Sequence, residues 1–154
     1  MSNSVAIGVA YQDQDITGGS LNDSPIGATT PSTIVGTTVY GSSEIGYSSA
    51  AQGTVTQATS KSTGVTLNKS MGKITMNAAS LGAGASVTFT LTNSTISAND
   101  VVIASISGGG TAGAYWPYVS SQATGSAVIG LWNSTGGALA EAVVINFAVI
   151  HGAS

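Results

Sequence analysis

Few residues in this chain have side chains that do chemistry. Its 154 residues include six acidic side chains, three lysines, one histidine and no cysteine. Charged residues make up 6% of the chain, whereas soluble domains average about a quarter. Catalysis, metal binding and phosphate recognition draw on these residue types, so the composition argues against an enzyme and against nucleic-acid binding. A hydrophobic content of 42% nevertheless predicts a folded chain.

Two aspartates near the N-terminus, Asp13 and Asp15, have the spacing that opens a calcium-binding loop. The complete EF-hand loop has a glutamate at its twelfth position, and Ser24 stands there in this chain. No helical pattern flanks the segment. We favour a turn-rich acidic loop over a calcium site, and we expect no metal and no cofactor.

The remaining titratable residues are scattered along the second part of the chain. A glycosidase needs two carboxylates that face each other at about 5–9.5 Å, but Asp100 lies at a predicted turn and Glu141 in a predicted loop, so we interpret both as solvated. His151 has no second histidine, cysteine or acid near it in the sequence. It therefore supports neither a metal site nor a catalytic triad, and we expect no enzymatic activity.

Aromatic residues form one cluster in the sequence. Tyr115, Trp116 and Tyr118 surround Pro117, and Trp132 lies one predicted strand later. Such residues are enriched in interface hot spots and also stack on sugars. We place Trp132 in the core, because large aromatic side chains are highly buried on average. For the cluster itself, contact with a partner and core packing remain equally open.

Charge and targeting signals exclude further partners. The lysines fall within a short stretch, Lys61–Lys73, where they form a small basic spot or solubilise strand edges. The first residues lack the basic and apolar regions of a secretory signal, and no apolar run approaches the roughly 20 residues of a membrane span. We therefore expect neither a nucleic-acid nor a membrane partner. Four Asn-x-Ser/Thr triplets are ascribed to chance: those at Asn22, Asn68, Asn93 and Asn133.

Alternation of apolar and polar residues from Gln52 onward predicts short strands separated by Gly-rich and Asn-rich turns. Three segments, 101–106, 128–132 and 143–150, are apolar on both faces, which indicates central strands or strands covered by another subunit. The pattern favours an all-β fold, an antiparallel, jelly-roll-like β-sandwich of about eight strands. The expected strands lie near residues 52–59, 64–68, 72–77, 85–92, 100–107, 114–121, 126–133 and 142–151.

The first 51 residues differ from the sandwich predicted for residues 52–154. They are rich in Gly, Ser, Thr and Pro and hold too few large apolar residues to build a core. We expect an extended N-terminal arm that contacts a neighbouring subunit or protein. The residues that we expect to bind a partner are Val5, Ile7, Val9, Tyr11, Ile26, Ile34, Val35 and Tyr40 of the arm, with Tyr115, Trp116 and Tyr118 of the sandwich.

Several stretches resemble bacteriophage virion surface proteins of the capsid decoration (cement) and head-fibre type. Residues 16–33, ITGGSLNDSPIGATTPST, resemble an N-terminal phrase of such proteins, and residues 57–69, QATSKSTGVTLNK, resemble the opening of a module common at their C-termini. The chain departs from the family pattern at Tyr115-Trp-Pro-Tyr118, where a plain Thr/Val strand is usual. Further similar segments are 37–39, 72–77, 87–93, 109–115 and 139–153.

This resemblance implies a non-enzymatic, trimeric β-sandwich on the virion surface. We expect a capsid decoration protein, made in the host cytoplasm, that forms a homotrimer on the outer head surface. Its partner would be the major capsid protein, whose neighbouring subunits it would bridge. The alternative is a tail or head fibre module that binds host-cell glycans through the aromatic residues around Trp116.

Overall fold

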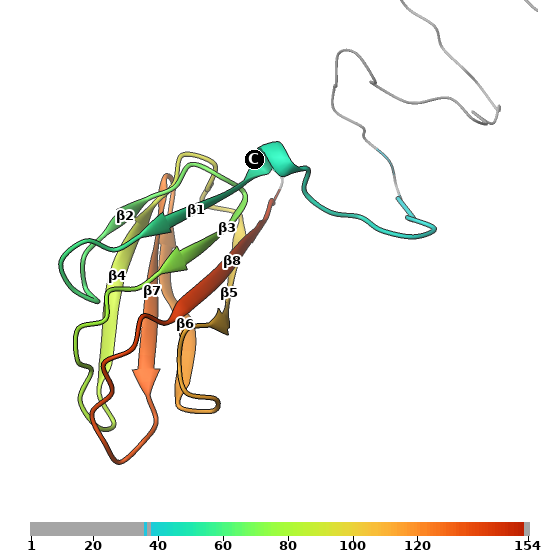
Figure 1. Cartoon of the computed structure of the whole chain (residues 1–154). Coiled ribbons are helices and arrows are strands. Elements are labelled where there is room, and N and C mark those ends of the chain that lie inside the picture. Colours follow the sequence, from blue (N-terminus) through green and yellow to red (C-terminus); the bar gives the residue numbers. More distant parts are fainter. Residues whose placement is uncertain (1–35, 37, 153–154) are drawn as a thin grey trace, which may run out of the picture. The chain divides into compact units, whose positions relative to one another are not determined.

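The strands of this protein form where apolar and polar residues alternate, close to the positions that the sequence predicts. The computed structural model describes Gly36 and residues 38–152 (Figure 1). A short 3-10 helix, η1 (Ser49–Ala51), precedes the first strand, and the other regular elements of the described residues are all strands. The eight strands are β1 (Gln52–Thr56), β2 (Val65–Thr66), β3 (Met71–Thr75), β4 (Ser86–Thr92), β5 (Val101–Gly108), β6 (Tyr115–Ala123), β7 (Ser126–Asn133) and β8 (Val144–Ile150).

Two four-stranded sheets pack against each other as a β-sandwich. The first sheet has the order β1-β3-β8-β5 and the second has the order β2-β4-β7-β6. The all-β sandwich is thus confirmed, but the sheets are mixed, because β1 pairs with β3, and β2 with β4, in parallel. The other four pairings are antiparallel. The expectation of a purely antiparallel, jelly-roll-like pairing is therefore wrong for these edges.

The path of the chain explains the parallel pairs. From β1 to β4 the chain passes from one sheet to the other at every connection. Strands two apart in the sequence therefore share a sheet, and both such pairs run parallel. Local turn signals reveal where the chain reverses but not which sheet receives the next strand, so the sequence pattern could not distinguish the two pairings.

The core lies between the two sheets and is apolar. In β4, Phe89 and Leu91 point inward, while Ser86, Thr88 and Thr90 are exposed, as the alternation predicts. The central strands β8 of the first sheet and β7 of the second each direct alternate residues into the core. The largest buried apolar side chains are Ile74, Met76, Leu91, Ile96, Ile129, Leu131, Val143, Ile145, Phe147 and Val149.

The positions of the strands in the sheets test the prediction that segments apolar on both faces are central strands. The prediction is confirmed for β7 and β8, whereas β5 is the edge strand of the first sheet. For β5, the alternative of a covering subunit therefore remains the prediction. Pro117 lies in β6, the edge strand of the second sheet, where a residue without an N–H is tolerated.

A compact unit begins at Ser43, and β1 begins at Gln52. Most of the predicted arm contacts lie outside the described residues, and Tyr40, which is described, is 91% exposed. Within the described part of the chain, no helix is long and apolar enough to cross a membrane. The arm contacts that lie outside the description are Val5, Ile7, Val9, Tyr11, Ile26, Ile34 and Val35.

Candidate functional site

The aromatic cluster divides between the core and the surface. Tyr115 is buried, whereas Trp116 is 60% exposed and Tyr118 is 38% exposed on the outer face of the second sheet. Trp132 is also on that face and is 43% exposed, so its placement in the core was wrong. The reason is the alternation of β7, in which the neighbours Leu131 and Asn133 take the inward positions.

The ring of Tyr118 lies flat on the backbone of Gly130. The two residues are paired across β6 and β7. A Cβ atom placed on Gly130 would meet Cζ of Tyr118 and lie 2.5 Å from both Cε atoms, and this symmetry puts it over the face of the ring. The hydroxyl of Tyr118 is 2.6 Å from Ser86 Oγ. One face of the phenol ring is therefore covered by the sheet and the opposite face is turned to solvent.

The two tryptophans lie beside each other on the same face. Trp116 and Trp132 are directly opposite in the β6–β7 register. The indole Nε1 of Trp132 donates a hydrogen bond of 3.1 Å to the carbonyl of Gly84, which fixes that ring. We call Trp116, Tyr118 and Trp132 the aromatic face. They lie where β6 begins and β7 ends, away from the end at which η1 and β1 begin (Figure 1).

No charged side chain belongs to the strands that carry the aromatic face. The sequences of β4, β6 and β7 contain neither acid nor base. Beside the aromatic rings, the outer positions of β4 present the hydroxyl groups of Thr88 and Thr90. These three strands therefore present an uncharged surface that combines ring faces with hydroxyl groups.

The outer face of the first sheet carries an apolar patch, which consists of Val101, Ile103 and Ile150. Each of the three is at least 50% exposed. Val101 is paired with Ile150, and Ile103 is paired with the half-buried Ala148 on the neighbouring strand β8. The patch lies where β5 begins and β8 ends. Contiguous exposed apolar residues make this patch a candidate site of association.

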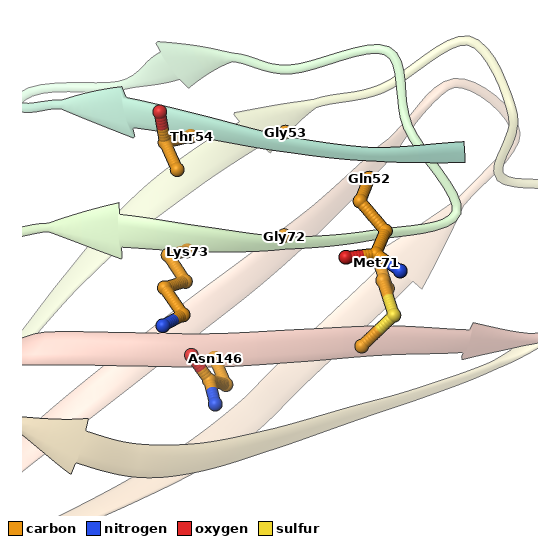
Figure 2. Close-up of a pocket in the computed structure, with 7 residues that line it drawn as sticks. All are labelled: Gln52, Gly53, Thr54, Met71, Gly72, Lys73 and Asn146. Atoms are coloured by element: carbon orange, nitrogen blue, oxygen red, sulfur yellow. The ribbon is translucent and has the colours of Figure 1, made fainter. Parts of the chain in front are cut away.

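A shallow cavity of about 260 Å³ opens on the same outer face, over β1, β3 and β8 (Figure 2). At one end Lys73 and Asn146 approach each other, and at the other Gln52 and Met71 do so (Figure 2). Oδ1 of Asn146 is buried and has no hydrogen-bond partner among the described residues. The cavity is lined by Gln52, Gly53, Thr54, Met71, Gly72, Lys73 and Asn146.

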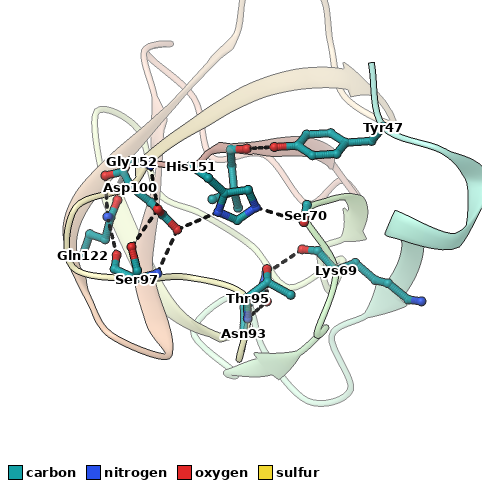
Figure 3. A network of polar contacts seen from close by, with 11 residues as sticks. Tyr47, Lys69, Ser70, Asn93, Thr95, Ser97, Asp100, Gln122, His151 and Gly152 are labelled. Atoms are coloured by element: carbon teal, nitrogen blue, oxygen red, sulfur yellow. Dashed lines mark hydrogen bonds and ion pairs between the residues drawn. The ribbon is translucent and has the colours of Figure 1, made fainter. Parts of the chain in front are cut away.

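The fold brings Ser70, His151 and Asp100 together at the end of the sandwich (Figure 3). Nε2 of His151 is 3.2 Å from Ser70 Oγ, and Nδ1 is 3.0 Å from Asp100 Oδ2. Asp100 also accepts hydrogen bonds from the N–H and hydroxyl of Ser97 and from the N–H of Gly152. These donors hold the pKa of Asp100 well below its ordinary value, against the opposing effect of burial.

The interpretation of Asp100 as solvated was wrong, because its side chain is 1% exposed. His151 has no acid near it in the sequence, but the fold places Asp100 beside it. The atom order matches a serine hydrolase relay, but acyl transfer also needs a substrate pocket and N–H donors for the oxyanion. The cavity described above is not lined by Ser70, His151 or Asp100. We interpret the cluster as a structural clamp, because its hydrogen bonds join residues 70, 97–100 and 151–152.

Contacts around the clamp join both sheets. Gln122 of β6 donates to the carbonyl of Asp100 at 2.6 Å, and Asn93, after β4, donates to the carbonyl of Lys69 at 2.7 Å. The hydroxyl of Tyr47 donates to the carbonyl of Val149. These bonds tie segments that are far apart in the sequence, which explains why the pattern of residues did not reveal them.

Lys61 and Glu141 are also more constrained than expected. Lys61 is 3% exposed, and its Nζ donates to the carbonyls of Asn77 and Glu141 at 2.7 and 2.5 Å. Burial lowers its pKa, and the charge of Glu141 opposes that shift. The N–H and hydroxyl of Thr111 lower the pKa of Glu141. Thus Lys61 does not solubilise an edge, and Glu141 is not a freely solvated loop residue.

Tyr115 is the inward member of the aromatic cluster. Burial, followed by the influence of Glu141, raises its pKa to about 12. The hydroxyl has no partner at hydrogen-bond geometry among the described residues, so we ascribe the influence of Glu141 to its charge. Tyr115 therefore fills the core and is not available to a partner.

Metal ligands do not gather in the described part of the chain, where no group of three or more His, Cys, Asp or Glu residues is found. Comparison with protein-family models, with curated proteins and with solved structures finds no match in any of the three. The functional argument therefore rests on the surfaces of the sandwich and on the residues themselves.

Proposed function

We propose that this protein is a bacteriophage capsid decoration (cement) protein that binds the outer head surface as a homotrimer. The observation that carries the proposal is the apolar patch of Val101, Ile103 and Ile150, exposed on a protein of very low charge. Such a surface favours association with another protein surface. The resemblance of several segments to phage virion proteins supports the same function.

The mechanism would be mechanical. A decoration protein that binds only the assembled shell stabilises it by mass action, as a ligand stabilises the state that it selects. The binding energy would come from buried apolar area, at about 25 cal/mol per Å² before the costs of association are subtracted. Because few charged groups are present, attachment should depend little on salt.

Binding to undecorated phage heads tests the proposal. We expect the full chain to sediment with heads, to raise their resistance to heat, and to stay attached in the presence of a chelator. Ile103→Asn should weaken attachment, whereas Thr88→Asn, an exposed change on the other sheet, should not. Heads that remain equally robust with and without the protein would refute the cement function.

The oligomeric state and the arm are tested separately. We expect a trimer in sedimentation equilibrium, and we expect deletion of residues 1–40 to leave a folded sandwich that no longer attaches to heads. Undiminished attachment of this truncated protein would show that the arm is not needed and that the apolar patch of the sandwich carries the contact alone. A full-length monomer would refute the trimer.

The second candidate function is a tail or head fibre module that binds host-cell glycans. The exposure of Trp116, Tyr118 and Trp132 on one uncharged face favours it, because fixed aromatic rings stack on sugars. A decoration protein should copurify with heads in many copies, whereas a fibre should bind cells. Virions that lack the protein and keep robust heads but lose adsorption would favour the fibre.

A further inference from the structure

We propose that the aromatic face of the second sheet is a binding site for neutral carbohydrate, with pyranose rings stacked on Trp116, Tyr118 and Trp132. This inference deepens the second candidate function and rests on it, since it names the ligand class and the residues that bind it. It does not depend on capsid decoration, for which we propose the apolar patch of the first sheet.

The orientation of the rings is the first argument. The Tyr118 ring covers Gly130 with one face, so its other face is presented flat to solvent. An aromatic ring beside a glycine also has a structural use, because it protects the exposed backbone of the sheet. That use accounts for Tyr118 but leaves the exposure of the two tryptophans unexplained.

Pre-organisation is the second argument. The polar atoms of two rings are already engaged within the protein, at Tyr118 Oη with Ser86 and at Trp132 Nε1 with Gly84. These bonds fix the rings before a ligand arrives, which lowers the entropic cost of binding. They also leave the apolar ring faces, rather than free donors, as the surface offered to the ligand.

The distribution of polar groups selects the ligand class. A sugar ring has an apolar face of C–H groups and a rim of hydroxyl groups, which suits ring faces beside Thr88 and Thr90. The absence of charge from β4, β6 and β7 leaves no partner on these strands for sialic acid, uronic acid or phosphate. Neutral glycans are therefore favoured over acidic glycans and nucleic acids.

The spacing of the rings suits more than one sugar unit. Trp116 and Trp132 are neighbours on adjacent strands, which lie about 4.8 Å apart. Tyr118 is two residues along β6 from Trp116, a separation of roughly 7 Å on the same face. Together the three rings form an open surface, so we expect a weak site, with a dissociation constant near ~1 mM for an oligosaccharide.

Intrinsic fluorescence gives a direct readout, because the chain has two tryptophans and both belong to the aromatic face. The full chain is titrated with neutral hexose oligosaccharides and with matched oligosaccharides that contain sialic or uronic acid. We expect a saturable change in tryptophan emission with a neutral oligosaccharide and none with the acidic series. The response should persist from about 50 to about 500 mM salt.

Matched variants separate the site from the rest of the surface. Because the variants remove a fluorophore, their binding is measured by retardation on an immobilised neutral glycan. Trp116→Ala and Trp132→Ala should each weaken binding about tenfold, whereas Ile103→Ala, on the opposite sheet, should not change it. Far-ultraviolet circular dichroism shows whether each variant is folded.

Three results would overturn the proposal. One is the lack of any response to neutral oligosaccharides at about 10 mM, well above the expected dissociation constant. Another is unchanged retardation of the folded double variant of both tryptophans. The third is a change of oligomeric state in the tryptophan variants, which would make the face an interface between copies. Each of these leaves two other tests unaffected. Adsorption of virions that lack the protein still tests the fibre function, and binding to undecorated heads still tests capsid decoration, so failure of the aromatic face is distinguishable from failure of either function.

Discussion

Replacement of Asn133 by alanine should destabilise the sandwich severely. Asn133 is fully buried, and its Nδ2 donates to the carbonyls of Leu81, Gly82 and Gly137 at 2.8–3.1 Å. Its Oδ1 accepts hydrogen bonds from the N–H and the hydroxyl of Thr135. One side chain thus holds two loop segments, residues 81–82 and 135–137, at the end of β7.

The magnitude follows from these five bonds. Each intramolecular hydrogen bond contributes about 1 kcal/mol net. The two N–H groups of Nδ2 are shared among three partly or fully buried carbonyls, and each carbonyl keeps a second donor, from Leu139, Ala85 or the Thr135 hydroxyl. Part of the loss is recovered by local relaxation and by water, so we expect Asn133→Ala to lower the free energy of unfolding by about 3–5 kcal/mol. The corresponding fall in Tm is roughly 10–25 °C.

Urea denaturation followed by circular dichroism measures this loss, and Asn146→Ala is the matched control. Asn146 lies in the central strand β8, but its Oδ1 has no hydrogen-bond partner among the described residues. Its replacement should therefore cost less than about 1 kcal/mol. Equal losses in the two variants, or a loss below about 1 kcal/mol for Asn133→Ala, would refute the reasoning.

Three further predictions test the clamp and the aromatic face. The pKa of Asp100 is lower in the folded protein than in the unfolded chain, so its contribution to stability is present above the ordinary carboxyl range and is lost as pH falls below about 4. The difference in Tm between wild type and Asp100→Asn should therefore shrink on acidification. A difference that grows on acidification would contradict this. Gly130→Ala should displace the Tyr118 ring and weaken retardation of the protein on the immobilised glycan. Gly136→Ala is the control, because a Cβ there meets open space, and it should leave retardation unchanged. Equal retardation of the two variants would contradict the stacking geometry. A fluorophosphonate probe should leave Ser70 unlabelled, because the clamp is structural, and labelling that Asp100→Asn abolishes would show a working hydrolase relay.

The sequence predicts the strands well because their information is local. Alternation in residues 86–92 depends on neighbours two positions apart, and each predicted strand overlaps an observed one. Sheet pairing is not local, and nothing near β1 in the sequence indicates that it runs parallel to β3. The clamp is hidden for the same reason, because Asp100 and His151 are 51 residues apart.

Burial was misjudged where average tendencies were applied to single residues. Trp132 is a large aromatic residue in a mostly apolar strand, yet its register places it outside. Lys61 is buried because backbone carbonyls receive its ammonium group, a possibility that composition does not reveal. A strict alternation count along β7, from the inward Ile129 and Leu131, would have placed Trp132 correctly.

Two of the Asn-x-Ser/Thr triplets that were ascribed to chance have a structural role. The triplet Asn-Ser-Thr occurs at Asn93 and at Asn133, directly after β4 and at the end of β7. In both copies the buried Asn Oδ1 accepts bonds from the N–H and hydroxyl of the threonine two residues later. The triplets are therefore strand-ending turns, and their buried asparagines are not accessible for glycosylation in the folded protein.

The aromatic rings lie at the end of the sandwich away from η1, and this position affects how strongly many copies bind together. If the chain is held near the end where β1 begins, the aromatic face of every copy lies at the end of the sandwich away from the support (Figure 1). Sites that are weak singly then act together, because the first contact raises the local concentration of the ligand at the others. Avidity of this kind exceeds single-site affinity by about 10²–10⁴ without any new contact. A shallow site with a millimolar dissociation constant, present in many copies on one particle, would thus suffice to retain the particle on a surface covered with glycans.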